Sequence, residues 1–284
     1  MTAVLIDVTA PDGPRAADVA APFLHADDLG AVRGDGVFET LLVRSGHLCN
    51  ADRHRDRFVS SAAMLDLPAP DLELWDRGID LALRQWAQGG GGEAAMRWVY
   101  SRGRESTGTP TGYILMSPVQ GRSGEVRVML AERGFSLDLG SRAPWALIGA
   151  KTLSYAANMA ALRYAKGNGF DDVIFTSAEG NLLEGPTSTL VLVRGDELLT
   201  PNPGEGVLPG TTQASLFDVA ADRGYTCTLA QLRPEDLHTA DSVWLVSSVR
   251  ILARVTSVDG QDLRAVSARQ IESFVSLCDD ALTA

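Results

Sequence analysis

The pattern that most limits the fold of this 284-residue chain is the mixing of short apolar strands with amphipathic helices along its whole length. In VFETLLV, residues at positions 37, 39, 41 and 43 alternate with those between them, which is typical of a strand, and Ser45-Gly46 follows as a hairpin turn. An apolar stripe predicts a helix that Asn50 or Asp52 caps and that ends near Leu65. A second helix is expected over 71–88, and further strands over 4–8, 95–101 and 112–117.

Residues 119–124, VQGRSG, have the composition of a linker between two lobes, which we expect to span residues 1–118 and 125–284. The second lobe shows the same mixture. Its expected strands cover 126–130, 172–176, 188–193, 197–199, 226–229, 242–246 and 252–256. Its expected helices cover about 155–166, 211–223, 234–238 and 268–281. This interleaving predicts an α+β or mixed α/β fold in two lobes.

Composition excludes several classes of function. A net charge of −11 argues against a nucleic-acid-binding surface, which needs dense positive charge, although a local arginine pocket can still bind a small anionic substrate. The apolar runs are too short for a membrane helix, and the first residues do not resemble a signal peptide. Cys49, Cys227 and Cys278 have unrelated spacings that suggest neither disulfides nor a zinc site. We therefore expect a cytoplasmic protein without a metal.

Lysine is rare in this chain, which makes one position conspicuous. Of 25 Lys and Arg residues, only Lys151 and Lys166 are lysines. Lys166 has an ordinary place at a helix end, before Gly167. Lys151 instead follows the mostly apolar PWALIGA at a strand-to-helix junction, and a lysine in apolar surroundings can act as an imine-forming amine. The alternative is a strand-end lysine whose ammonium group reaches solvent.

Three further parts of the sequence carry polar groups that could bind a ligand or take part in catalysis. Glu184 stands at an apolar strand end before a Gly-Pro turn, where its carboxylate would stay ionised beside a buried cation, or else face solvent. Thr211 and Thr212 open a helix after Gly210, as a phosphate site or as a plain cap. Arg57 borders an apolar stripe and can grip a phosphate with two donors, unless it is simply solvated.

Other catalytic signatures are missing from the sequence. The four histidines have no metal spacing, and the chain contains no H-E-x-x-H, G-x-S-x-G, Walker A or G-x-G-x-x-G motif.

The polar positions occur in an order that resembles the fold-type IV, or class IV, enzymes that depend on pyridoxal phosphate (PLP). These include branched-chain aminotransferases, D-amino acid aminotransferases and aminodeoxychorismate lyases. The similar stretches span about residues 34–260 and read GDGVFETLLV, RHRDRFVSSA, KTLSYAANMAALRYAKGNGFDDVIFTSAEGNLLEGPTSTLVLV, GVLPGTTQ and SSVRILARVTSVDG. The resemblance implies a smaller N-terminal α/β lobe, a larger cofactor-binding lobe with a mixed-sheet pseudo-barrel, and a homodimer with its site where lobes and subunits meet.

The resemblance also implies roles for single residues. Lys151 is similar to the lysine that bonds covalently to PLP and later shuttles the proton. Glu184 is similar to the acid at the pyridine nitrogen, and Arg57 to the arginine on the phosphate. The hydroxyl groups at the phosphate would be those of Thr211, Thr212 and Ser248.

Three positions depart from the family pattern. Ser188-Thr189 stands for the usual Ser-Asn, and Thr211-Thr212-Gln213 for the Ile-Thr-Arg of many members. Tyr155 follows Lys151 by four residues, whereas branched-chain enzymes have a tyrosine five residues later, which weighs against branched-chain specificity.

Two reactions fit this resemblance. Thr40 falls where lyases carry a threonine near the reacting atoms, and residues 99–103 resemble the lyase "SRG" strand. Arg102 and Arg250 would suit a substrate with two carboxylates. We therefore favour an aminodeoxychorismate lyase that releases pyruvate and p-aminobenzoate, with an amino acid aminotransferase as the alternative. Thr40 also fits a strand by β-propensity alone. A third hypothesis is a PLP-binding protein without turnover.

Overall fold

The computed structural model describes residues 3–119 and 121–283, so Gln120 of the predicted linker, together with residues 1, 2 and 284, lies outside the described residues. The chain divides into two compact units. Unit 1 comprises the described part of residues 1–121 together with Ala150–Tyr155, and unit 2 comprises Arg122–Gly149 and the described part of residues 156–284. Each unit has its own sheet, and each is described separately.

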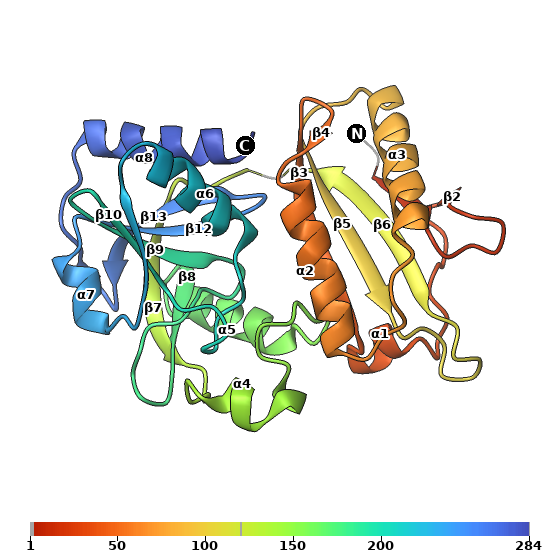
Figure 1. The fold of residues 1–284 in the computed structure, drawn as a ribbon, viewed down its shortest axis with the longest axis horizontal. Helices are drawn as coiled ribbons and strands as arrows, with labels where there is room; N and C mark the ends of the chain where they lie inside the picture. The colour runs from red at the N-terminus through yellow and green to blue at the C-terminus, as the bar shows by residue number, and fades with distance from the viewer. Residues whose placement is uncertain (1–2, 120, 284) are drawn as a thin grey trace. The chain divides into compact units, whose positions relative to one another are not determined.

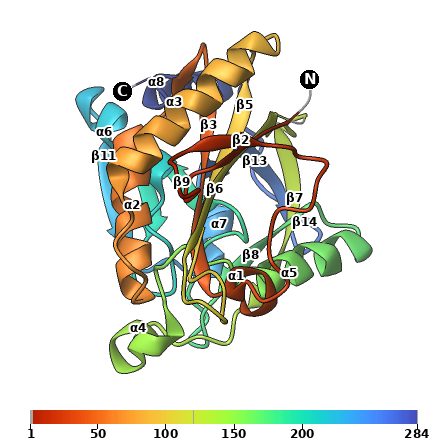
Figure 2. The ribbon, with the colours of Figure 1, turned by 90° about the vertical axis from the view of Figure 1, so that its right-hand side faces the viewer.

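Unit 1 is a six-stranded antiparallel sheet in the order β2-β1-β6-β5-β3-β4. Its strands are β1 (Val4–Asp7), β2 (Arg15–Ala17), β3 (Gly36–Arg44), β4 (His47–Leu48), β5 (Ala94–Ser101) and β6 (Thr111–Pro118). Its helices are α1 (Leu29–Arg33), α2 (Ala51–Met64) and α3 (Leu72–Gln88). Helices α2 and α3 cover the same face of the sheet (Figure 2).

Aromatic side chains fill the space between these two helices and the sheet. The Phe58 ring of α2 lies 4.8 Å from the Trp75 ring of α3 and 5.8 Å from the Trp98 ring of β5. All three side chains are almost fully buried. Rings of this size bury a large apolar area and pack edge to face, so they fix α2 against the sheet. Asp71 caps α3 through the amides of residues 73 and 74, as helix N-termini prefer.

The segment from Ala150 to Tyr155 belongs to unit 1 although it lies far along the chain. The amide of Phe38 donates to the Lys151 carbonyl at 3.0 Å, and the amide of Leu153 donates to the Gly36 carbonyl at 2.8 Å. These bonds attach the segment to β3. The predicted division, with residues 125–284 in a single lobe, differs from the structure at this segment, because the partners of its backbone lie in β3.

Unit 2 is built on a mixed sheet in the order β11-β10-β9-β12-β13-β7-β8, with β14 paired to β13. Strand pairs β10–β11, β13–β7 and β7–β8 are parallel, and the others are antiparallel. Its strands are β7 (Glu125–Glu132), β8 (Asp172–Thr176), β9 (Thr189–Arg194), β10 (Glu197–Pro201), β11 (Thr226–Ala230), β12 (Ser242–Ser247), β13 (Ile251–Val258) and β14 (Gln261–Asp262). Its helices, labelled in Figure 1, are α4 (Leu139–Arg142), α5 (Ala156–Gly167), α6 (Thr211–Asp222), α7 (Pro234–Thr239) and α8 (Ala268–Ala281). A 3-10 turn, η1 (Pro144–Ala146), follows α4.

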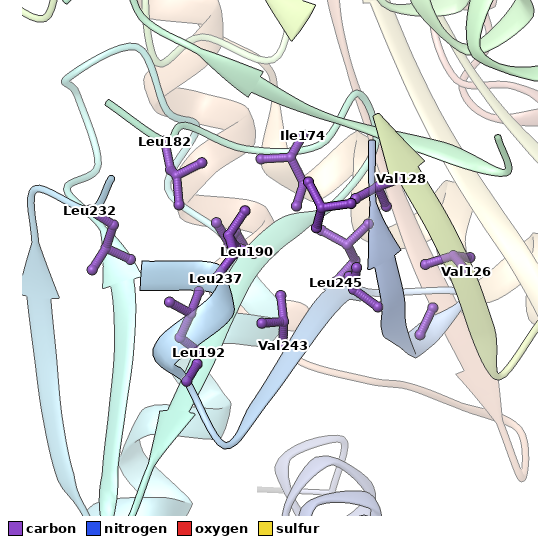
Figure 3. Close-up of a cluster of buried hydrophobic side chains, with 14 of the residues drawn as sticks. Val126, Val128, Ile174, Leu182, Leu190, Leu192, Leu232, Leu237, Val243 and Leu245 are labelled. Atoms are coloured by element: carbon purple, nitrogen blue, oxygen red, sulfur yellow. The ribbon is translucent and has the colours of Figure 1, made fainter. Parts of the chain in front are cut away.

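The two faces of this sheet bury different clusters because neighbouring side chains of a strand alternate. Leu190 of β9, Leu245 of β12 and Leu237 of α7 belong to one cluster, whose side chains gather in a common interior (Figure 3). On the other face, the Trp244 ring stacks on Phe274 of α8 at 4.4 Å. Burying each leucine stabilises the fold by about 2 kcal/mol. The mixed α/β architecture expected from the sequence is confirmed.

Candidate active site

Lys151 is held in unit 1 by its backbone and surrounded by aromatic rings. Its amide donates to Ser61 Oγ of α2 at 3.1 Å, and its carbonyl accepts from Phe38 of β3. Its Nζ lies 4.6 Å from the centre of the Phe38 ring and 5.9 Å from that of Tyr155. The residue is half-buried. The Lys151 amine is thus placed over an aromatic surface by two secondary-structure elements.

The face of β3 that carries Phe38 also carries Thr40, since alternate residues of a strand share a face. Thr40 is half-buried and lies opposite Arg97 of β5 in the register of the sheet. The Phe38 and Tyr155 rings meet edge to face at 5.3 Å. Thr40 therefore lies on the side of the sheet where the Lys151 amine contacts Phe38.

The opposite face of β3 carries a buried carboxylate that binds Arg57. Arg57 Nε donates to Glu39 Oε1 and Arg57 Nη2 donates to Glu39 Oε2, both at 2.7 Å. His54 Nδ1 lies 2.6 Å from Glu39 Oε2. The exposed fractions of these side chains are 0% for Glu39, 1% for His54 and 10% for Arg57, so this ion pair is almost completely shielded from water.

The charges of this network follow from its contacts. Burial alone would raise the pKa of Glu39, but the Arg57 guanidinium and the His54 N–H outweigh it and hold that pKa well below its usual range. Burial lowers the pKa of His54 despite the raising effect of Glu39. At neutral pH the network therefore contains an ionised Glu39, a charged Arg57 and a neutral His54, which donates through Nδ1.

Arg102, a predicted substrate residue, is occupied by contacts inside unit 1. Its Nε and Nη2 donate to the Asp35 carboxylate, and its guanidinium also donates to the carbonyls of Leu65 and Asp66. The ion pair with Asp35 raises the pKa of Arg102. The neighbouring Gly103 has a φ of +78°. These contacts show that Arg102 of the "SRG" segment stabilises the fold of unit 1. Binding of substrate by Arg102 stays a prediction.

In unit 2, three hydroxyl groups meet at the start of α6. The hydroxyl oxygens of Thr211 and Thr212 each lie 3.4 Å from Ser248 Oγ. Gly210 is the N-cap, and no side chain caps the helix there. A Cβ on Gly210 would lie 2.3 Å from Thr189 Oγ1, so the turn packs closely against β9. Amides of a helix N-terminus together with converging hydroxyls are donors suited to a phosphate.

Glu184 lies in the loop between β8 and β9, and its carboxylate is largely buried. Its Oε2 accepts from the Leu208 amide at 3.1 Å, and its Oε1 lies 3.5 Å from Arg133 Nη1. Arg133 in turn lies over the Phe175 ring, at 4.8 Å, and donates to Asn158 Oδ1 at 3.4 Å. Leu208 belongs to the same VLPGTTQ stretch as the Thr211 turn, so the backbone links the carboxylate to the hydroxyl group cluster.

Arg250 lies two residues after Ser248 in the turn between β12 and β13. Its Nη1 donates to Asp172 Oδ2 at 2.7 Å. Its Nε and Nη2 are buried and have no hydrogen-bond partner among the described residues. Buried donors are normally paired, so these two atoms point to a missing acceptor. The next residue, Ile251, has a φ of +69°, which is strained for a β-branched side chain.

Known proteins identify the group to which this arrangement belongs. The family profile described as "Amino-transferase class IV" matches residues 36–258, most of the chain. The chain belongs to the class IV aminotransferases. A Mycobacterium tuberculosis protein named bifunctional aminodeoxychorismate lyase / D-amino acid transaminase is 46% identical over 273 residues, which cover 92% of this chain and 94% of that protein.

Solved structures of class IV aminotransferases agree with this fold. The PLP-bound form of a hypothetical aminotransferase from Mycobacterium tuberculosis is 44% identical and has a TM-score of 0.93. The match covers 99% of this chain and 99% of that protein. A fold IV-transaminase from Curtobacterium pusillum is 38% identical with a TM-score of 0.92, covering 98% of this chain and 99% of its own. The predicted family, its fold and its use of PLP are confirmed at the level of the family.

Four polar residues of this class IV aminotransferase were missed from the sequence: Glu39, His54, Arg133 and Asn158. A signal for Glu39 existed, because a carboxylate at an alternate position among apolar strand residues needs a buried partner. The His54–Arg57 spacing of three places both side chains on one side of a helix. For Arg133 and Asn158 the sequence offers no local signal. None of the helices in residues 3–119 and 121–283 has the length and apolar character to cross a membrane.

Proposed function

We propose that this chain is a PLP-dependent enzyme that releases pyruvate from aminodeoxychorismate to give p-aminobenzoate, and that it also transfers amino groups of D-amino acids. The observation that carries this proposal is the 46% identity, over 92% of the chain, to the protein named for both activities. The match also covers 94% of that relative, so the likeness extends over nearly the whole length of both chains. We also propose a homodimer in the cytoplasm.

The residues present fit the chemistry of PLP. In unit 2, the hydroxyls of Thr211, Thr212 and Ser248 and the amides of the α6 N-terminus are donors suited to a phosphate. The tight contact of Gly210 with Thr189 leaves no space for a larger side chain there. In unit 1, Arg57 carries a guanidinium whose donors suit an anionic group such as a phosphate.

Lys151 and Glu184 are the residues that we assign to the reactive part of the cofactor. When bound, PLP draws electrons away from the substrate carbon that carries the amine. Glu184, whose carboxylate accepts from the Leu208 amide, would stabilise a protonated ring nitrogen, since a carboxylate favours a neighbouring positive charge. Lys151 Nζ would hold the aldehyde carbon of PLP, and its amine would serve as the base that moves the proton of the substrate carbon.

Substrate recognition needs groups for two carboxylates in the lyase reaction. Arg250 is suited to one of them, because its buried Nε and Nη2 are donors without a partner among the described residues and the bond to Asp172 fixes its position. Thr40 offers a hydroxyl on the face of β3 that carries Phe38, the ring that the Lys151 amine contacts. We assign Thr40 to the reacting end of the substrate.

The test is to incubate purified enzyme with aminodeoxychorismate and follow p-aminobenzoate, without any keto acid. In a second reaction, D-alanine or L-alanine is supplied with 2-oxoglutarate. We expect p-aminobenzoate release that needs no acceptor, and amino transfer from the D-isomer. An enzyme that forms no p-aminobenzoate but transaminates an amino acid rapidly would leave only the transaminase half of the proposal.

A Thr40→Val variant is the matched control, because valine keeps the branched shape of threonine and removes the hydroxyl. We expect it to lower the lyase rate roughly a hundredfold or more, as for the loss of a general acid or base, and to lower the transaminase rate much less. Equal losses in both reactions would show that Thr40 has no special place in the lyase chemistry.

A further inference from the structure

Glu39 is a fully buried carboxylate whose three nearest donors all come from one face of α2. Two are the Nε and Nη2 of Arg57, and the third is Nδ1 of His54. All three distances are 2.6–2.7 Å, which is short for hydrogen bonds of this kind. A carboxylate with no exposed surface cannot be explained as a solvated strand residue, so its partners must explain it.

The geometry of the pair restrains Arg57 in both position and rotation. A bidentate contact through Nε and Nη2 fixes the plane of a guanidinium, whereas a single contact would leave it free to turn. The His54 N–H then prevents rotation of the carboxylate itself by bonding to Oε2. Because burial keeps His54 neutral, the network adds no second positive charge beside Arg57.

We propose that Glu39 and His54 are positioning residues that orient Arg57 to bind the phosphate of the cofactor. This inference rests on the proposed function, since Arg57 is assigned there to the phosphate. Neither Glu39 nor His54 touches the cofactor in this account. They act through Arg57, whose side chain would otherwise have several orientations.

The same helix also holds the reactive lysine. Ser61, four residues after Arg57, is buried, and its Oγ accepts a hydrogen bond from the Lys151 amide at 3.1 Å. Four residues correspond to about one helical turn, a rise of ~6 Å. Helix α2 therefore fixes the separation of Arg57 and the Lys151 backbone, and Glu39 fixes α2 to the strand that pairs with the Lys151 segment.

Glutamine at position 39 cannot reproduce this network. Whichever way its amide is turned, its NH2 group would face a donor of Arg57, and arginine has no acceptor. His54 could exchange its tautomer to accept from the amide, but Arg57 could not adapt. A Glu39→Gln substitution thus preserves the size of the side chain while it expels the Arg57 guanidinium from its position.

The experiment compares the binding of pyridoxamine phosphate and pyridoxamine to the apoenzyme by calorimetry. The two differ only in the phosphate, and neither can bond covalently to Lys151. We expect Glu39→Gln to weaken pyridoxamine phosphate about tenfold to a hundredfold, the range for one charged hydrogen bond, and pyridoxamine less than twofold. Glu93→Gln is the matched control, because it removes a carboxylate from the half-exposed pair with Arg44 in the same unit and should change neither affinity.

Two results would overturn the inference: unchanged affinity of Glu39→Gln for pyridoxamine phosphate, or equal loss for both compounds, which would indicate only a structural role. If Glu39→Gln fails to fold, His54→Asn is the second test. The asparagine amide can still donate to Glu39, but the variant lacks the imidazole ring that packs around the carboxylate. We expect a smaller, phosphate-dependent loss, and no phosphate-dependent loss would contradict the inference. Failure of the wild-type protein to bind either compound would instead overturn the proposed function.

Discussion

Gly210→Ala tests whether the turn before α6 has the tight packing on which phosphate binding depends. The new Cβ would lie 2.3 Å from Thr189 Oγ1, and 3.3 Å from the Cβ atoms of Thr189 and Gln213. Ordinary contacts begin at 3.4 Å, so the hydroxyl or the turn must move by about 1 Å. Gly210 has an ordinary φ of −75°, and therefore the contact, not backbone strain, is responsible.

Relief of this contact is difficult because Thr189 is buried and begins β9, which pairs with β12. One rotation of the Thr189 side chain would bring its methyl group to the same place, and the other would move both the hydroxyl and the methyl group within a buried site. We expect Gly210→Ala to destabilise the protein by about 1–3 kcal/mol, the usual cost of overpacking, and to weaken pyridoxamine phosphate binding. The assays are urea unfolding midpoints and calorimetric titration.

The matched rescue is the double variant Gly210→Ala with Thr189→Ala. It removes the clashing hydroxyl, so it should be more stable than the sum of the single changes predicts, with a coupling of at least about 1 kcal/mol. Wild-type stability of Gly210→Ala, or additive effects in the double variant, would refute the packing argument.

Three further changes test other parts of the structure. Because the pKa of His54 is lowered in the folded protein, the unfolded chain takes up a proton there more readily as the pH falls. Between pH 7.5 and 5.5 this difference should lower the free energy of unfolding by up to about 1.4 kcal/mol. Urea unfolding at both pH values should show that His54→Asn removes this part of the pH dependence. Gly103→Ala should destabilise the protein by at least about 3 kcal/mol, because the new Cβ would lie 1.8 Å from the Thr109 carbonyl oxygen. Gly91→Ala also lies at positive φ but has open space around it, so it should cost about 1 kcal/mol. Similar shifts in melting temperature for both variants would contradict this. Glu184→Gln should lower the lyase and transaminase rates roughly tenfold to a thousandfold by lowering the pKa of the ring nitrogen, and unchanged rates would remove Glu184 from that role.

Much of the fold could be predicted from the sequence because its elements have strong local patterns. Helix α8 and strand β8 occupy the predicted residues, and α3 begins at Leu72, one residue after its predicted start. The short α4 and η1 were missed, since four or three residues show no period. At α2 the N-cap is Asn50, one of the two expected residues, but its backbone is left-handed and its side chain makes no capping bond.

The candidate site was harder to predict because its contacts join distant residues. Lys151 could be predicted because lysine is rare in this chain, and Thr211 because it stands at the start of a predicted helix. The order of both along the chain resembles that of the family. The bond from Arg133 to Glu184 spans 51 residues, and that from Arg57 to Glu39 spans 18. Local periodicity contains no information about such pairs, so only the folded chain shows them.

The central claim is that Lys151 carries the cofactor. The most direct measurement is mass spectrometry of peptides from the PLP-incubated protein after borohydride reduction, which makes the bond to lysine permanent. Because Lys151 and Lys166 are the two lysines of the chain, the result is unambiguous. We predict a phosphopyridoxyl group on the peptide that contains Lys151 and none on the Lys166 peptide. A label on Lys166, or no label on either, would contradict the account.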